Sequence, residues 1–168
     1  MPLVKIGDLP DDARAWVFGS DRTLDTGASG SLLNEVDRFL SQWKAHEAPL
    51  TVGREWKYGR FLTVAVDQST TGASGCSLDG LFRTLKSLEP RLGASLVTSG
   101  LIFFRDDKGA IQSVDREQFT ALGAEGKVGP DTQVFDPTVT TLRECRARFE
   151  LNAGDSWHAK LLGKTQPA

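Results

Sequence analysis

Residues 54–66 read Arg54-Glu-Trp-Lys-Tyr-Gly-Arg-Phe-Leu-Thr-Val-Ala-Val66, and this stretch decides the fold. Its first part, residues 54–58, alternates polar and apolar side chains, which is the pattern of a strand with one buried face. Gly59 breaks the run, and residues 60–66 continue with apolar side chains that suit both faces of a buried strand. We therefore predict a hairpin over 54–66 whose second strand is central in its sheet.

A second hairpin is predicted further along the chain. Residues 101–105 are mainly apolar, residues 110–114 follow, and the turn between them ends in Gly109, where we expect a positive φ. Short runs at 15–18 and 132–135 have the composition of two more strands. Hairpins outnumber strand-helix-strand crossovers, so we predict an α+β fold with a mainly antiparallel sheet of about five or six strands and helices packed on it.

Apolar side chains at helical spacing predict the helices. One helix should begin at Ser31, and another should follow the second strand of the first hairpin and be interrupted at Pro90. Asp115 and Gln118 have the spacing of a capping box at the start of a third helix. A last long helix should follow the pair Asp136-Pro137 and turn four side chains inward, those of Val139, Leu142, Cys145 and Phe149.

Length, charge and hydropathy narrow the class of protein. A chain of 168 residues is long enough for one core, so we predict a single domain over residues 1–168. A formal charge of −2 argues against a dedicated nucleic-acid binder. No apolar run approaches the roughly twenty residues of a membrane span or the length of a signal peptide, so we expect a cytoplasmic protein without membrane insertion.

The loop that follows the first hairpin is the strongest candidate for a site. It reads Asp67-Gln-Ser-Thr-Thr-Gly-Ala-Ser-Gly-Cys-Ser-Leu-Asp-Gly80 and leads into a helix, where unpaired N–H groups and the positive helix end favour an anion. We predict a pocket for a small anionic ligand, with six residues in contact with it: Ser69, Ser74, Gly75, Ser77, Asp79 and Trp157. The alternative is a well-capped turn, in which Ser77 caps the helix and Cys76 fills an apolar gap.

Cys76 raises the alternative of an enzyme. A cysteine nucleophile needs a base, and the chain has two histidines, His46 and His158. In this version the N–H groups of Gly75, Cys76 and Ser77 form an oxyanion or phosphate cradle. Each histidine also has a structural explanation, as a polar residue near a helix end or in a turn. No close pair of His or Cys anchors a metal, so we predict no metal site and no cofactor.

Five stretches of the chain resemble a known family. They are Ala15-Trp-Val-Phe18, Phe39-x-x-x-Trp43-x-x-His46, Tyr58-x-Arg-Phe61 leading to Ala65-Val66, Ala73-Ser-Gly-Cys-Ser-Leu-Asp79 and Asp155-Ser-Trp-His158. In this order they resemble a family of small bacterial proteins of uncharacterised function that carry the label "ABC transporter ATPase". The label does not fit the residues, because the chain has neither a Walker A motif nor an ABC signature. The resemblance implies membership and site positions, but it implies no activity.

Three functions follow from these residues. The first is binding of a small ligand or anion at the loop from Ser69 to Asp79. The second is an enzyme with Cys76 as nucleophile and His46 or His158 as its base. The third is a non-catalytic interaction or scaffold protein, whose protein partner the sequence does not identify.

Overall fold

The computed structural model describes residues 3–45, 48–49, 51–67, 75–97 and 100–162, with the backbone alone described at 44–45, 48–49 and 75–77. The chain divides into two compact units. Unit 1 comprises residues 1–98 and 137–146, and unit 2 comprises residues 99–136 and 147–168. Each unit holds a four-stranded sheet, and a further two-stranded pair, β3 (Lys44–Ala45) with β4 (Ala48–Pro49), follows the first helix. The predicted α+β class is confirmed, but the strands form two sheets instead of one sheet of five or six.

The sheet of unit 1 is built around the predicted hairpin. Strands β5 (Val52–Lys57) and β6 (Phe61–Val66) pair in antiparallel register, and β2 (Arg14–Gly19) pairs with the other edge of β6. The edge strand β1 (Leu3–Lys5) runs parallel to β5 and leads into a short 3-10 helix, η1 (Ile6–Asp8). Every residue of β6 is buried, which confirms that the second hairpin strand is central.

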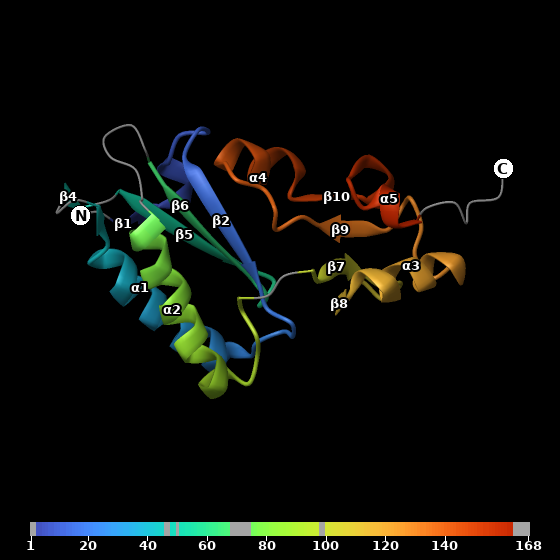
Figure 1. Cartoon of the computed structure of the whole chain (residues 1–168), viewed down its shortest axis with the longest axis horizontal. Coiled ribbons are helices and arrows are strands. Elements are labelled where there is room, and N and C mark those ends of the chain that lie inside the picture. Colours follow the sequence, from blue (N-terminus) through green and yellow to red (C-terminus); the bar gives the residue numbers. More distant parts are fainter. Residues whose placement is uncertain (1–2, 46–47, 50, 68–74, 98–99, 163–168) are drawn as a thin grey trace. The chain divides into compact units, whose positions relative to one another are not determined.

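Helices α1 (Thr26–Ser41) and α2 (Gly75–Leu92) cover one face of this sheet (Figure 1). The apolar residues of both helices meet those of the strands in a core that includes Leu32, Val36, Leu40, Val64, Val66, Leu81 and Leu85. The Cβ-sized space above Gly80 is closed by the ring of Phe39, so the two helices approach closely there. This core fixes the direction in which α2 leaves the candidate loop.

Two helix boundaries differ from those predicted. Helix α1 begins at Thr26, five positions before Ser31, because the Asp25 side chain accepts a 2.8 Å hydrogen bond from the N–H of Ala28. The small polar residues of this first turn carry no apolar periodicity that would have shown it. Helix α2 is not interrupted at Pro90 but runs through it to Leu92, because a proline this close to the end removes a single helical hydrogen bond.

The second face of the unit 1 sheet is covered by a segment that returns from unit 2. Thr140 accepts a 2.9 Å hydrogen bond from the N–H of Ala15, and the N–H of Leu142 donates to the carbonyl of Ala13 at 3.0 Å. Leu142 then packs on Ala13, Ala15 and Ala65, whose small side chains let the segment lie close to the strands. The returning segment therefore pairs with the start of β2 and also covers one face of the unit 1 sheet.

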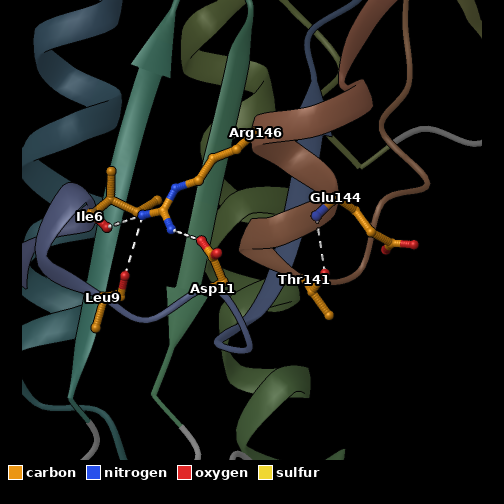
Figure 2. Close-up of polar contacts among 6 residues, drawn as sticks. All are labelled: Ile6, Leu9, Asp11, Thr141, Glu144 and Arg146. Carbon is orange, nitrogen blue, oxygen red and sulfur yellow. Dashed lines mark hydrogen bonds and ion pairs between the residues drawn. The ribbon is translucent and has the colours of Figure 1, made fainter.

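Helix α4 (Leu142–Arg148) continues this segment, and it is shorter than the long helix predicted after Asp136-Pro137. It begins later because the hydroxyl of Thr141 accepts a hydrogen bond from the N–H of Glu144 at 3.2 Å and so caps the first turn. Figure 2 shows this cap and the anchor of the helix, the Arg146 guanidinium, which forms an ion pair with Asp11. The same guanidinium donates to the carbonyls of Ile6 and Leu9 at 3.4 and 3.3 Å.

Unit 2 is a sheet with helices on one face. Its strand order is β10-β9-β7-β8, with bounds Glu150–Asn152, Gln133–Phe135, Ile102–Arg105 and Ile111–Val114. The predicted hairpin β7–β8 is confirmed, and Gly109 in its turn has a φ of 83°. Helix α3 (Arg116–Ala124) carries the predicted capping box. The 3-10 helix η2 (Ala153–Asp155) and the short helix α5 (Ala159–Leu162) complete a core that includes Ile102, Phe104, Phe119, Val134 and Leu162.

Candidate functional site

The predicted loop site is described only where it becomes a helix. Ser69, Ser74 and His46 lie outside the described residues. Helix α2 begins at Gly75, so residues 75–77 form its first turn. Asp79 follows in the second turn, where its side chain is exposed.

The first turn of α2 has the properties that an anion requires. The first N–H groups of a helix have no acceptor within the helix, and residues 75–77 supply three of them. The helix is 18 residues long, and no acidic side chain lies in its first turn to neutralise the positive end. The carboxylate of Asp79 stands one turn further on and weakens, by its charge, the attraction for an anion.

The structure brings two other predicted site residues together in unit 2. The rings of Trp157 and His158 stack with their centroids 4.0 Å apart and their planes at 24°. The hydroxyl of Ser156 lies 2.8 Å from Nδ1 of His158, and the ring of Phe119 from α3 meets the imidazole edge to face at 6.2 Å. The imidazole is fully buried. His158 is therefore held on three sides by its own turn and by α3.

Burial decides the charge of this histidine. The pKa of His158 is lowered from 6.5 to about 4, and burial is the largest cause. The carboxylate of Asp136 opposes this shift, and the guanidinium of Arg116 adds to it. The ring is neutral at pH 7. A neutral imidazole can accept a proton, but Nδ1 already contacts Ser156 and Nε2 is enclosed by protein. These features favour the structural explanation of His158, and a role as base for Cys76 stays a prediction.

Three buried side-chain nitrogens in the described part of the chain have no hydrogen-bond partner: Arg60 Nη1, Trp157 Nε1 and His158 Nε2. Sequence reasoning selected His158 as one of two possible bases for Cys76, and Trp157 as its neighbour in the stretch Asp155-Ser-Trp-His158. It gave no weight to Arg60, whose burial nothing in the local pattern indicates. It also missed Arg116, whose guanidinium carbon lies 5.4 Å from the centre of the Trp157 ring.

A cleft of about 530 Å³ was not predicted either. It lies in unit 2 between the β7–β8 turn and the loop 126–133, and it is lined by charges of both signs, among them Asp106, Lys127 and Asp131. The Asp106 carboxylate is already used, because it accepts hydrogen bonds from the N–H groups of Lys108 and Ala110. The cleft therefore has no single charge character that selects a ligand.

Among the side chains that the structure describes, no three of His, Cys, Asp or Glu are grouped so that they could hold a metal ion. Among the helices that the structure describes, none combines the length and the apolar character needed to cross a membrane.

No model of a known protein family matches the chain, and comparisons with curated proteins and with solved structures likewise give no match. The function must therefore be argued from the residues of this chain. The resemblance to the small bacterial family stays an expectation.

Proposed function

We propose that the protein binds a small anionic ligand at the start of α2, in the cytoplasm, as the loop chemistry suggests. The observation that carries the proposal is the start of the helix at Gly75. It puts the N–H groups of Gly75, Cys76 and Ser77 in the first helical turn, where they lack helical acceptors. Oriented N–H donors and the positive end of a long helix together form a common anion site.

Backbone NMR tests this site directly. Inorganic phosphate, titrated at constant ionic strength against chloride, should shift the amide resonances of residues 75–77 in a saturable way. Gly75→Pro is the matched variant, because proline is favoured in the first turn of a helix and removes one donor without breaking the helix. It should weaken phosphate binding several-fold. Resonances that do not move with phosphate, in a folded protein, would refute the proposal.

The variant Asp79→Asn should change the affinity for phosphate in the opposite direction to Gly75→Pro. Removal of this exposed negative charge near the helix start should tighten phosphate binding about 2-fold to 5-fold, as expected for a screened surface charge. A variant that binds phosphate more weakly than the parent would show that Asp79 contributes in another way, for example as a helix-stabilising group. Comparison of the phosphate affinities of G75P and D79N therefore separates the effect of a lost N–H donor from the effect of a changed charge.

The second candidate function is an enzyme with Cys76 as its nucleophile. The observation that favours it is the position of Cys76 as the second residue of α2, where the helix field lowers a thiol pKa. Iodoacetamide labelling of the variant Cys145→Ala, followed across pH, measures the pKa of Cys76. A value well below 8.5 would support a reactive thiol. A pKa at or above 8.5 would exclude the enzyme function, so that ligand binding and protein interaction would remain as candidates.

A further inference from the structure

We infer that Trp157, His158 and Arg116 form a binding site for a small carboxylate in unit 2, separate from the first turn of α2. The site is defined by two buried nitrogens without a partner, Nε1 of Trp157 and Nε2 of His158, which belong to stacked neighbouring rings. More than nine in ten buried polar groups in proteins have a hydrogen-bond partner. Two such exceptions on stacked neighbouring rings are the basis for proposing a polar ligand there.

The donor pattern selects the chemistry of that group. Indole Nε1 of Trp157 can only donate a hydrogen bond. The Ser156 hydroxyl is 2.8 Å from Nδ1 of His158, and when it donates to Nδ1 the imidazole proton resides on Nε2. Both unpartnered nitrogens are then donors. A ligand must supply acceptor oxygens, and a carboxylate supplies two of them.

The charges around the two rings are of both signs, and one of them is a cation that can receive an anion. The Arg116 guanidinium stands over the Trp157 ring at 5.4 Å, and no ion pair engages it within the described residues. Asp136 is the opposing charge that acts on His158, and it is buried and engaged in interactions of its own. One added negative charge between Arg116 and the imidazole therefore has a cation to pair with.

The site is close enough to the surface to be entered. His158 is fully buried, but Trp157 is only half-buried and Arg116 is exposed. The Arg116 guanidinium lies over the indole, so displacement of this side chain is the proposed route of entry. Because both nitrogens are enclosed by protein atoms, we restrict the proposal to ligands in the size range of formate or acetate.

The indole N–H resonance of Trp157 is the direct readout. The chain has four tryptophans, and Trp157→Phe identifies the signal by its loss while it keeps an aromatic ring for stacking. At pH 7 acetate should shift this resonance in a saturable way, and the other three indole signals should stay in place. Acetamide has the same shape without the charge, and it should shift the resonance at least 10-fold less at equal concentration.

Arg116→Gln should weaken the acetate response at least 5-fold. Arg14→Gln is the matched control, because Arg14 is also exposed and lies 5.3 Å from the ring of Trp16, whose nitrogen is not among the buried unpartnered atoms. It should leave the response unchanged. If both variants weaken the response equally, the response depends on the overall charge of the protein and not on this site, and the inference is overturned.

A second measurement uses the two histidines of the chain. A carboxylate bound at Nε2 should raise the pKa of His158 by about one unit or more, as an opposite charge in contact does, while His46 serves as the internal reference. An unchanged pKa of His158, or equal shifts of both histidines, would contradict the site. The phosphate titration of residues 75–77 reports on another unit, so either proposal can fail while the other holds.

Discussion

His158 combines full burial with a turn that holds its ring in place, and this makes folding sensitive to acid. Its pKa is about 4 in the folded protein and near 6.5 when unfolded. Between these values the unfolded chain binds more protons, so stability is full above pH 6.5 and falls as the pH drops to 4. Urea unfolding across this range should show a loss of up to about 3 kcal/mol from this residue.

Two glutamine variants isolate that effect. His158→Gln should flatten the pH dependence between 4 and 6.5, because glutamine does not titrate, although it lowers stability at pH 7. His46→Gln should leave the slope as it is in the parent. If the slope persists in H158Q, the acid sensitivity comes from other groups and the buried neutral state of His158 is not its cause.

Cys145 should be the inert thiol of the chain. Burial and, to a smaller extent, the charge of Glu55 raise its pKa to about 11. The variant Cys76→Ser, which leaves one cysteine, should therefore react with iodoacetamide very slowly at pH 8 and faster only as the pH approaches 11. The same variant in urea should react at the rate of an ordinary cysteine. Fast labelling in the folded state would show that the Cys145 contacts with the Ala13 and Ala65 side of the sheet open readily.

At the scale of elements, the β5–β6 turn is the place where a glycine is required. Gly59 has a φ of 67°, and an added Cβ would lie 3.1 Å from the carbonyl oxygen of Leu24 and 3.2 Å from the methyl group of Thr23. Gly59→Ala should cost more than about 1–2 kcal/mol, the usual cost of a left-handed conformation alone. Chemical unfolding measures the difference.

Two other glycines calibrate this prediction. Gly109 has a φ of 83° with open space around it, so Gly109→Ala should show the backbone cost without the contact. Gly30 lies inside α1 with nothing within 4 Å, and Gly30→Ala should stabilise the protein by about 1 kcal/mol. The expected order of stability is G30A, parent, G109A, G59A. A G59A variant as stable as G109A would mean that the Leu24 loop moves aside at little cost.

The elements that the sequence predicted correctly are those determined by neighbouring residues. The capping box of Asp115 and Gln118, the glycine turn at Gly109 and the hairpin over 54–66 depend on contacts within a few positions. The division of the strands into two sheets could not be predicted, because alternation shows that a strand is half-buried without naming its partner. The delayed start of α4 depends on the Thr141 cap, which an apolar pattern does not contain.

The candidate sites follow the same rule. The start of α2 was predicted from one continuous stretch of sequence, with Ser77 as the cap in the capped-turn alternative. The helix begins earlier, at Gly75, so Ser77 is its third residue and does not cap it. The pairing of Arg116 with Trp157 was not predicted, because the two residues are far apart in sequence and arginine is common in exposed helix positions. Only tertiary packing of α3 against the turn before α5 brings them together.

At the scale of the whole molecule, the chain leaves unit 1, builds most of unit 2 and returns for residues 137–146. Besides its own local hydrogen bonds, this return segment is bonded to the start of unit 1 through Asp11, Ala13 and Ala15. Its protection against hydrogen exchange should therefore follow that of β2. The expectation of one domain stays a prediction, and exchange can measure how far the two units unfold as one.

Leu142 and Leu162 form a matched pair for this measurement, because each is 3% exposed and each packs in the core of a different unit. A buried leucine truncated to alanine costs roughly 2–5 kcal/mol through lost contacts and a cavity. In native-state hydrogen exchange, Leu142→Ala should lower the protection of β2, β6 and residues 137–146 and spare β7. Leu162→Ala should do the reverse, with α3 and β7 the most affected. Equal loss throughout the molecule in both variants would show one cooperative domain, since a defect in either core would then be felt by every strand.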